Sequence, residues 1–151
     1  MSTTSEYWVG PVIGEGAFGQ VLYGKHKGTG RAVALKVMEQ VVLKKQPHVL
    51  PSVLTERRLL QLFQESNYVV NLWASFYDSQ CVYLVLELAQ GGDLQGFIEL
   101  GLLWNDNDDN SSSNTKDRWH RSIPYYAWQL TQAIEFLHSK RVIHCDLKPA
   151  N

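Results

Sequence analysis

The sequence has few cysteines, no long apolar segment and no excess of charge of either sign. Only Cys81 and Cys145 occur among 151 residues, which excludes a disulfide-framed domain and favours a reducing compartment. No apolar run approaches the roughly 18 residues that span a bilayer. The first ten residues lack the basic and apolar regions of a secretory signal. Lys and Arg number 14 against 15 Asp and Glu, which excludes a strongly basic nucleic-acid-binding domain.

What is present is an ordinary globular composition. Apolar residues make up 44% of the chain and charged residues 19%, enough apolar side chains to fill the core of one domain of average size. We therefore expect a cytoplasmic or nuclear protein with no membrane span and no nucleic-acid partner.

The first 89 residues contain short, β-branched and aromatic segments separated by turn signals, which is the pattern of strands. One segment between them has apolar residues at helical spacing instead. We expect strands at 7–13, 21–26, 31–38, 69–77 and 81–86, and a helix at 52–63.

After residue 89 the pattern becomes helical. We expect a short helix at 93–100 with Asp93 as its N-cap, and a long helix at 123–140 with Pro124 in its first turn. Between them lies a polar insertion at 101–121, flexible over 105–117. The predicted fold class is α+β: a five-stranded antiparallel sheet with one helix in 1–89, and the first helices of a mainly helical domain in 90–151.

Residues 14–19 form a G-x-G-x-x-G run, and glycine lets a backbone approach a polyphosphate closely and present its N–H groups. The run is Gly14, Glu15, Gly16, Ala17, Phe18 and Gly19. Alone it is a weak signal, because dinucleotide-binding proteins use it directly before a helix. Here strand-like residues follow, which favours a glycine loop between two strands, with Val21 over a bound base. An ordinary hairpin without a ligand is the alternative.

Lys36 and Glu56 form the second candidate constellation. In a strand, Ala34 and Lys36 share one face, while Val33 and its alternate neighbours point into the core. A lysine in such apolar sequence needs an anionic partner, and Glu56 lies on the apolar side of the 52–63 helix, where a carboxylate also needs a partner. An ion pair satisfies both and would hold the ammonium against nucleotide phosphates. The alternative is that Glu56 reaches solvent at the helix edge.

The third constellation is the segment 144–151, HCDLKPAN. It places the carboxylate of Asp146, the ammonium of Lys148 and the amide of Asn151 on one short loop. Phosphoryl transfer uses these groups as a base-like carboxylate, a cation for developing charge and an oxygen ligand for Mg²⁺.

The chain resembles the first part of a eukaryotic protein kinase domain, through five motifs in the family's order: GEGAFGQV (14–21), VALK (33–36), LTERRLLQL (54–62), LVLELAQGGDL (84–94) and HCDLKPAN (144–151). LKP after Asp146 is similar to the serine/threonine branch, and the TERRLLQ and GGDL stretches are similar to its AGC group. The resemblance implies transfer of phosphate from Mg-ATP to protein serine or threonine hydroxyls.

The resemblance also assigns roles to single residues. It implies that Gly14, Gly16 and Gly19 cover ATP, that Val21 and Ala34 contact adenine, and that Lys36, paired with Glu56, holds the α and β phosphates. Backbone atoms of Glu87 and Ala89 would contact adenine behind Leu86, and Asp93 would reach the ribose. Asp146 would be the catalytic aspartate, Lys148 the γ-phosphate contact and Asn151 a metal ligand. The AGC likeness implies a docking peptide at the 52–63 helix, near Val41, Val42, Leu43 and Val53, for which packing against the sheet is the alternative.

Two departures from the family pattern bear on function. Cys145 stands where the family usually has an arginine that binds an activation-loop phosphate, so we expect phosphorylation to activate less strongly, or to act through other basic residues. The D-F-G aspartate is not among these residues, so we expect the 151 residues alone to transfer no phosphate. Two other functions stay open: an inactive kinase-like nucleotide-binding or interaction module, and a nicotinamide-dependent oxidoreductase, which requires a helix directly after Gly19.

Overall fold

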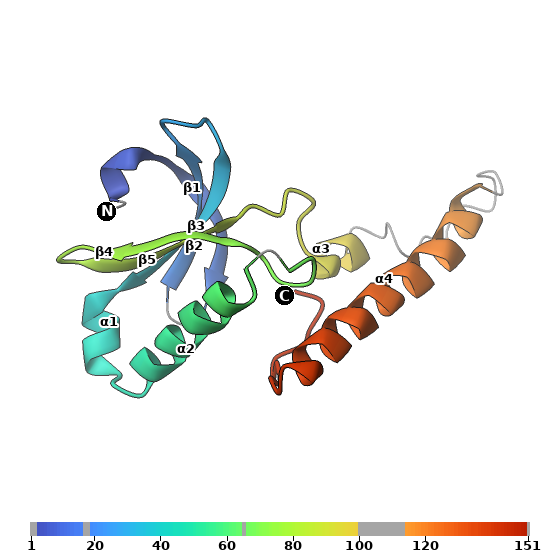
Figure 1. Ribbon diagram of the computed structural model, residues 1–151. Coiled ribbons are helices and arrows are strands. Elements are labelled where there is room, and N and C mark those ends of the chain that lie inside the picture. Colours follow the sequence, from blue (N-terminus) through green and yellow to red (C-terminus); the bar gives the residue numbers. More distant parts are fainter. Residues whose placement is uncertain (1–2, 17–18, 65, 100–113, 151) are drawn as a thin grey trace. The chain divides into compact units, whose positions relative to one another are not determined.

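The computed structural model describes residues 3–16, 19–64, 66–99 and 114–150, with the side chains of the last range described from residue 124 (Figure 1). The chain divides into two units, Met1–Ala89 and Gln90–Asn151. The division falls where the sequence changes from strand-like to helical segments.

The first unit is an antiparallel sheet with helices in one of its connections. A short 3-10 helix, η1 (Thr4–Glu6), precedes the first strand. The five strands lie in the order β1-β2-β3-β5-β4, and two helices connect β3 to β4. The strands are β1 (Tyr7–Gly16), β2 (Gly19–His26), β3 (Ala32–Glu39), β4 (Leu72–Tyr77) and β5 (Cys81–Glu87); the helices are α1 (Gln40–Lys45) and α2 (Val49–Leu62).

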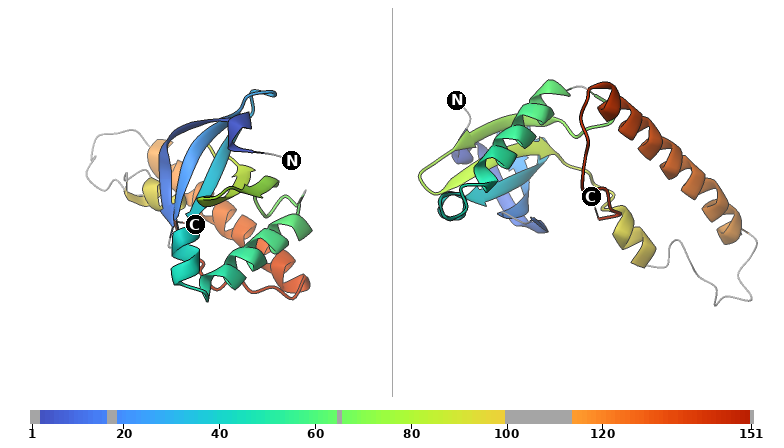
Figure 2. Two further views of the ribbon diagram at one scale, coloured as in Figure 1. Left: turned by 90° about the vertical axis from the view of Figure 1, so that its left-hand side faces the viewer. Right: turned by 90° about the horizontal axis from the view of Figure 1, so that it is seen from below.

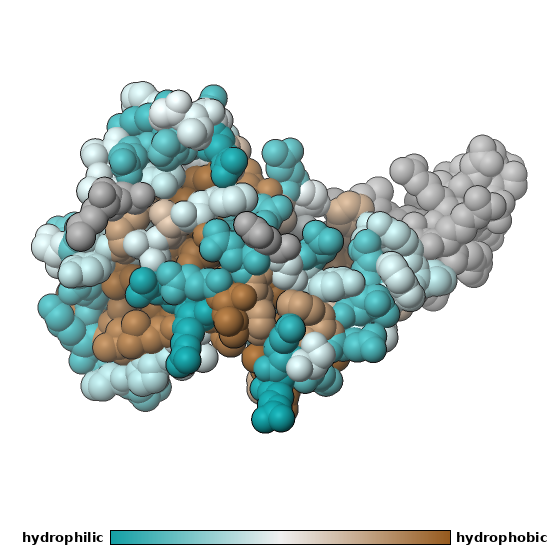
Figure 3. Space-filling view, viewed as in Figure 1, coloured by the Kyte–Doolittle hydropathy of each residue, from teal (hydrophilic) through white to brown (hydrophobic). Residues whose placement is uncertain are grey.

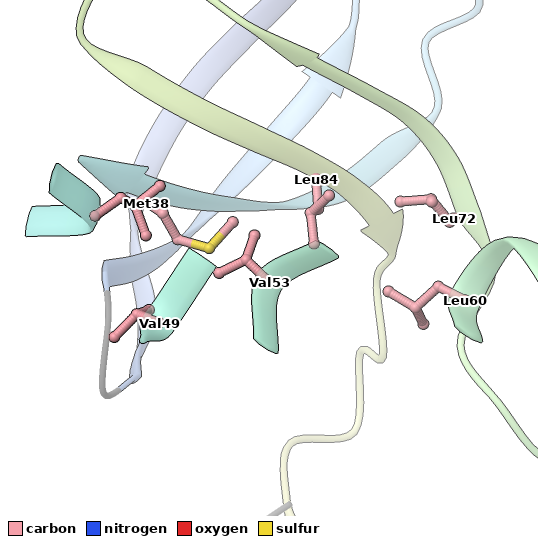
Figure 4. Close-up of a cluster of buried hydrophobic side chains, with 7 residues drawn as sticks. Met38, Val49, Val53, Leu60, Leu72 and Leu84 are labelled. Atoms are coloured by element: carbon pink, nitrogen blue, oxygen red, sulfur yellow. The ribbon is translucent and has the colours of Figure 1, made fainter. Parts of the chain in front are cut away.

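Helix α2 packs its apolar side against one face of the sheet (Figures 1 and 2). Residues spaced four and seven apart along the helix meet side chains from β3, β4 and β5, because such residues share one helical face. Figure 4 labels six residues of this cluster: Met38, Val49, Val53, Leu60, Leu72 and Leu84. Leu43 of α1 is also a member. Met38 and Leu84 have no exposed surface, so the cluster fixes α2 on the sheet.

The sheet curls so that its two edge strands, β1 and β4, approach each other and cover part of its opposite face. Tyr7 of β1 stacks on Phe76 of β4 with ring centroids 6.1 Å apart, although β1 and β4 are the two edge strands. The curl encloses a second cluster, formed by Tyr7, Val33, Leu35 and Val85. Both faces of β3 are therefore apolar, which explains its nearly continuous hydrophobic sequence.

The five strands and the helix expected in the first 89 residues are confirmed, with shifted ends. Strand β1 continues three residues further, through Gly16, and β4 begins at Leu72 rather than at 69. Helix α1 was not expected, because its six residues are too few to show helical periodicity. The structure also settles two residues offered for a docking groove: Leu43 and Val53 belong to the core, so packing is their role.

The turn between β4 and β5 is organised by Asp78. Its Oδ1 accepts hydrogen bonds from the backbone N–H groups of Gln80 and Cys81, both at 2.8 Å. These bonds, that from Cys81 first, hold the pKa of the Asp78 carboxyl below its ordinary value. Tyr83 donates its hydroxyl to Asp78 Oδ2 at 2.9 Å. Burial, and then this hydrogen bond, raise the pKa of Tyr83.

We predict that Asp78→Asn makes the stability of the protein less sensitive to acid. A carboxyl whose pKa is lower in the folded state stabilises the fold above its unfolded pKa, 3.8 for this aspartate, and this contribution disappears as pH falls through the folded pKa. The midpoint of thermal unfolding should therefore fall more steeply below about pH 4 in the wild type than in Asp78→Asn. Ser79→Ala, in the same turn, should follow the wild type. Parallel acid profiles for wild type and Asp78→Asn would contradict the prediction.

The second unit contains α3 (Leu94–Glu99) and α4 (Asn114–Ser139). Asp93 caps α3 as expected: its Oδ1 accepts the N–H of Gly96 at 2.7 Å. The expected start of the long helix was wrong, since α4 begins at Asn114 and Pro124 lies within it. Residues 114–121, which belong to the expected polar insertion at 101–121, are helical; polar composition alone does not exclude a helix, and Lys116, Arg118 and Arg121 favour one. The rest of the 105–117 segment lies outside the described residues.

Helix α4 ends in a turn that directs the last residues. Arg141 has a φ of 60°, its N–H bonds His138 O, and the N–H of Val142 bonds Leu137 O. This is a Schellman motif with arginine in the left-handed position that glycine usually takes. Gln95 of α3 then donates its N–H to Pro149 O at 2.9 Å, which ties the final loop to α3. No helix among the described residues is long and apolar enough to cross a membrane.

Candidate functional site

The glycine run and the buried lysine lie in one row across the sheet. Gly14 is paired with Val21, Val21 with Lys36, and Lys36 with Leu84. Neighbouring strands are about 4.8 Å apart, so the row brings Gly14 to about 10 Å from Lys36. Strand β2 begins at Gly19, the last residue of the run. The expected strand–glycine loop–strand arrangement is therefore confirmed, and the helix that a nicotinamide-dependent oxidoreductase requires there is absent.

The three glycines of the run differ in how much room the structure leaves for a side chain. A Cβ on Gly19 would lie 2.0 Å from Val37 O, so the sheet itself requires glycine there. A Cβ on Gly14 would meet nothing closer than 3.7 Å, and one on Gly16 nothing closer than 3.6 Å. The packing of the described residues therefore does not require glycine at 14 and 16, which fits a backbone that a ligand approaches closely.

Lys36 and Glu56 form the expected ion pair. Lys36 Nζ lies 2.7 Å from Glu56 Oε1 and 2.8 Å from Oε2. The side chains are 27% and 37% exposed, so the pair is reachable from solvent. Glu56 lies on the same side of α2 as the buried Val53 and Leu60, which carries it to β3. An ammonium has three donors, and two serve Glu56, so one remains for another acceptor.

An apolar strip continues from this row toward the end of β5. Ala34 is paired with Tyr23 on one side and Leu86 on the other, and it shares the Lys36 face. Ala34 is 8% exposed, and Val21 is half-buried. Ile13, directly before Gly14, is 48% exposed and was not among the expected site residues. Only its position in the sequence, as an apolar residue directly before the glycine run, could have indicated Ile13 as a site residue.

The last residue of β5, Glu87, is held by hydrogen bonds with Asn71. The N–H of Glu87 donates to Asn71 O at 2.8 Å, while Glu87 Oε2 accepts from Asn71 Nδ2 at 2.8 Å. Since the N–H of Glu87 is used, a backbone contact with a base through this residue must use its carbonyl oxygen. Ala89 follows and is exposed. Nothing local in the sequence indicates Asn71, because its partner is 16 residues away.

The second unit holds the other candidate residues on its final loop. Lys148 Nζ lies 3.0 Å from Asp146 Oδ2, with both side chains more than half exposed. The N–H of Asp146 lies 3.3 Å from His144 Nδ1. Cys145, between them, has a φ of 66°, in the left-handed region. The loop thus presents a carboxylate and an ammonium side by side, as the spacing of 144–151 predicted.

The remaining expected residues are placed as follows. Glu15 is exposed and paired with Gln20 at the end of the β1–β2 ladder. Asp93 is exposed and caps α3 through one carboxylate oxygen. Ala17, Phe18 and Asn151 lie outside the described residues. Among the described residues no three His, Cys, Asp or Glu side chains gather into a metal site.

A glycine run between two strands, a lysine–glutamate pair beside it, and an Asp–Lys loop later in the chain follow the order of motifs that the resemblance to protein kinases implies. The family model for the protein kinase domain matches residues 7–151. The chain therefore belongs to the protein kinase domain family.

Curated relatives of the chain carry kinase names, and two of them, from Dictyostelium discoideum and Saccharomyces cerevisiae, are named as probable or established serine/threonine-protein kinases. Rho-associated protein kinase 1 of Homo sapiens is 31% identical over 146 residues, which cover 97% of this chain and 10% of the relative. Serine/threonine-protein kinase PKH2 of Saccharomyces cerevisiae is 33% identical over 146 residues, covering 97% of this chain and 12% of the relative. An Aurora kinase of Debaryomyces hansenii is 29% identical over 152 residues, covering 99% and 32%. The resemblance to serine/threonine protein kinases is thus confirmed.

The chain spans about a tenth of the length of the Rho-associated kinases. The activity, substrates and partners of the whole protein are therefore matters for proposal.

Proposed function

We propose that this protein is an ATP-dependent serine/threonine protein kinase, which transfers the γ-phosphoryl group of Mg-ATP to a hydroxyl of a protein substrate. The observation that carries the proposal is the Lys36–Glu56 ion pair in the same row as the glycine run. It places one cation, with a donor to spare, beside a backbone that two glycines leave uncovered.

The first unit would bind the nucleotide. Backbone N–H groups of Gly14, Gly16 and Gly19 and the ammonium of Lys36 would face the phosphates. Adenine would lie on the strip of Val21 and Ala34, and would meet the carbonyl oxygen of Glu87 and the backbone of Ala89. The resemblance to the family supports a ribose contact by Asp93, which has one carboxylate oxygen engaged in its cap.

The final loop would serve the chemistry. Asp146 would accept the proton of the attacking substrate hydroxyl. As that proton leaves, the hydroxyl oxygen would bond to the γ-phosphorus and the bond between the γ-phosphorus and the leaving ADP oxygen would break. Lys148, already 3.0 Å from Asp146, would offset the charge that develops on the transferred group. Asn151 is the expected protein ligand of Mg²⁺, which would supply positive charge to the phosphates. Magnesium takes few protein ligands and keeps waters and phosphate oxygens, so a dedicated acidic cage, which the described residues do not form, is not needed.

The proposal predicts that Asp146→Asn in the full-length protein lowers phosphate transfer by about 100-fold to 10,000-fold, because a positioned base is lost. The assay follows labelled γ-phosphate into a general protein substrate, beside ATP binding. Glu135→Gln, the same kind of change on the exposed side of α4, should keep full activity. ATP binding without transfer in the wild type would select the inactive kinase-like module instead. The expectation that the 151 residues alone are inactive stays a prediction, which the same assay tests.

We also propose a docking peptide with apolar side chains at α1 and α2. Figure 3 shows apolar residues gathered over this region, and Val41, Leu50 and Leu54 are exposed there. Arg57 donates to Ser75 Oγ at 2.9 Å, which bridges α2 to β4 beside them. A peptide with apolar side chains would cover this surface as the AGC likeness implies.

A further inference from the structure

The base end of the proposed nucleotide site depends on how strand β5 ends. Glu87 is the last residue of β5 and is paired with Val33 of β3. Leu88 and Ala89 follow outside the strand, and Ala89 is exposed. The backbone groups that would meet adenine belong to Glu87 and Ala89, so their positions depend on what holds Glu87.

Asn71 holds Glu87 through three hydrogen bonds. The N–H of Glu87 donates to Asn71 O at 2.8 Å. In the other direction, Glu87 Oε2 accepts from Asn71 Nδ2 at 2.8 Å and from Asn71 N at 3.2 Å. Asn71 lies directly before Leu72, which is paired with Leu86, so these bonds extend the β4–β5 ladder by one position. Backbone and side chain of Glu87 are thus held by the same residue.

We propose that Asn71 is a positioning residue for the nucleotide base, and that its hold on Glu87 favours adenine over guanine. This role rests on the proposed function. Because the N–H of Glu87 is already bonded, its carbonyl oxygen is the backbone group that this residue can offer to a base. The amino group on C6 of adenine can donate to that oxygen. Guanine carries an oxygen on C6 instead, and two acceptors that face each other both stay unpaired.

The side-chain amide of Asn71 contributes to this hold because its acceptor is a carboxylate. Hydrogen bonds to charged acceptors are stronger than those between neutral groups. Strand ends with few buried contacts open more easily than strand centres, and Glu87 is exposed at the end of β5. Without the amide, the end of β5 should move more freely. A shift of about 1 Å would then weaken the hydrogen bond to the base.

Asn71→Ala in the full-length protein tests this role. Isothermal titration calorimetry with Mg-ATP and Mg-GTP gives a dissociation constant for each nucleotide. The constant for ATP should rise about fivefold and that for GTP should change less, so the preference for ATP falls. At saturating ATP the rate of phosphate transfer should stay within about twofold of the wild type, since a looser hold on the base weakens binding rather than chemistry. Asn67→Ala, at an exposed position of the same loop, is the matched control and should bind both nucleotides like the wild type.

An exchange of the two side chains separates positioning from a merely structural role. Asn71→Asp places two carboxylates together and should weaken ATP binding at least as much as Asn71→Ala. Adding Glu87→Gln restores a donor and an acceptor with the partners reversed, so the double variant should recover most of the affinity and the preference for ATP. Partial unfolding would instead lower the number of sites for both nucleotides equally and leave the preference unchanged.

The outcomes distinguish this role from the nucleotide site itself. If the wild type binds ATP and Asn71→Ala keeps the same preference for ATP over GTP, Asn71 is not a positioning residue, although the nucleotide site stands. Failure of the double variant to recover ATP binding would also overturn the role. If the wild type binds no ATP, the proposed function fails and the role of Asn71 fails with it.

Discussion

Replacing Lys36 with methionine is expected to reduce phosphoryl transfer by at least about 100-fold while the protein stays folded. The ammonium is the cation of the site row, and methionine keeps the aliphatic length of the side chain without its charge. The fold should survive because Lys36 belongs to neither buried cluster and is 27% exposed. Glu56, left behind, is 37% exposed and remains hydrated.

The measurement is the rate of transfer at several ATP concentrations in the full-length protein, with circular dichroism as a check of folding. Lys44→Met, in the exposed last turn of α1, should have no effect. Glu56→Gln should cause a smaller loss than Lys36→Met, because the ammonium is then present but poorly positioned. The double variant should be no worse than Lys36→Met alone, since the two residues act as one unit. Full activity of Lys36→Met would show that the ion pair is only structural.

The second large effect concerns Gly19. Gly19→Ala should destabilise the protein by about 3 kcal/mol or more, at or above the upper end of the usual cost of overpacking. The added methyl group would lie 2.0 Å from Val37 O and 3.1 Å from Met38 Cα, and backbone atoms of a central strand cannot move aside as a flexible side chain could. Urea unfolding monitored by circular dichroism measures the loss.

Gly14→Ala is the matched control for stability and a probe of nucleotide binding. Its methyl group meets only Val21 atoms at 3.7 Å or more, so unfolding should be nearly unchanged. Affinity for ATP should nevertheless fall, because the methyl group would stand where a phosphate approaches the backbone. If both variants unfold like the wild type, the tight β2–β3 contact is wrong. If Gly14→Ala binds ATP normally, the phosphates do not lie over that strand.

Much of the first unit could be predicted because its signals are local. Alternation in β3 indicated which residues share a face with Lys36, and helical spacing placed Glu56 on the apolar side of α2. The face of β3 that carries Lys36 and the side of α2 that carries Glu56 must pack together, so each of the two charges needs a partner on the other surface. The ion pair between them could therefore be predicted. The sequence did not indicate that the sheet curls until Tyr7 meets Phe76, because that contact joins residues 69 positions apart.

The second unit was predicted less well. The start of α4 was placed at 123 because Pro124 fits a first turn and the preceding residues show no apolar periodicity. A helix can begin in a segment without apolar periodicity, so the lack of periodicity before residue 123 does not mark a helix boundary. The Asp146–Lys148 pair was expected because a spacing of two residues keeps the side chains close on any tight loop. The bond from Gln95 to Pro149 could not be predicted, since it joins backbone atoms of distant segments.

The stacked pair of Tyr7 and Phe76 has a mechanical consequence. It joins the two edges of the sheet at the start of β1, whereas the glycine run lies at the far end of the same strand. Between them, β1 loses regular pairing twice, between Val9 and Val12 and between Val12 and Gly14. The β1–β2 hairpin is therefore held at one end by the Tyr7–Phe76 contact, and its backbone pairing is irregular between that end and the glycine run. We expect the glycine end of the hairpin to move more readily than the end held by Tyr7 and Phe76.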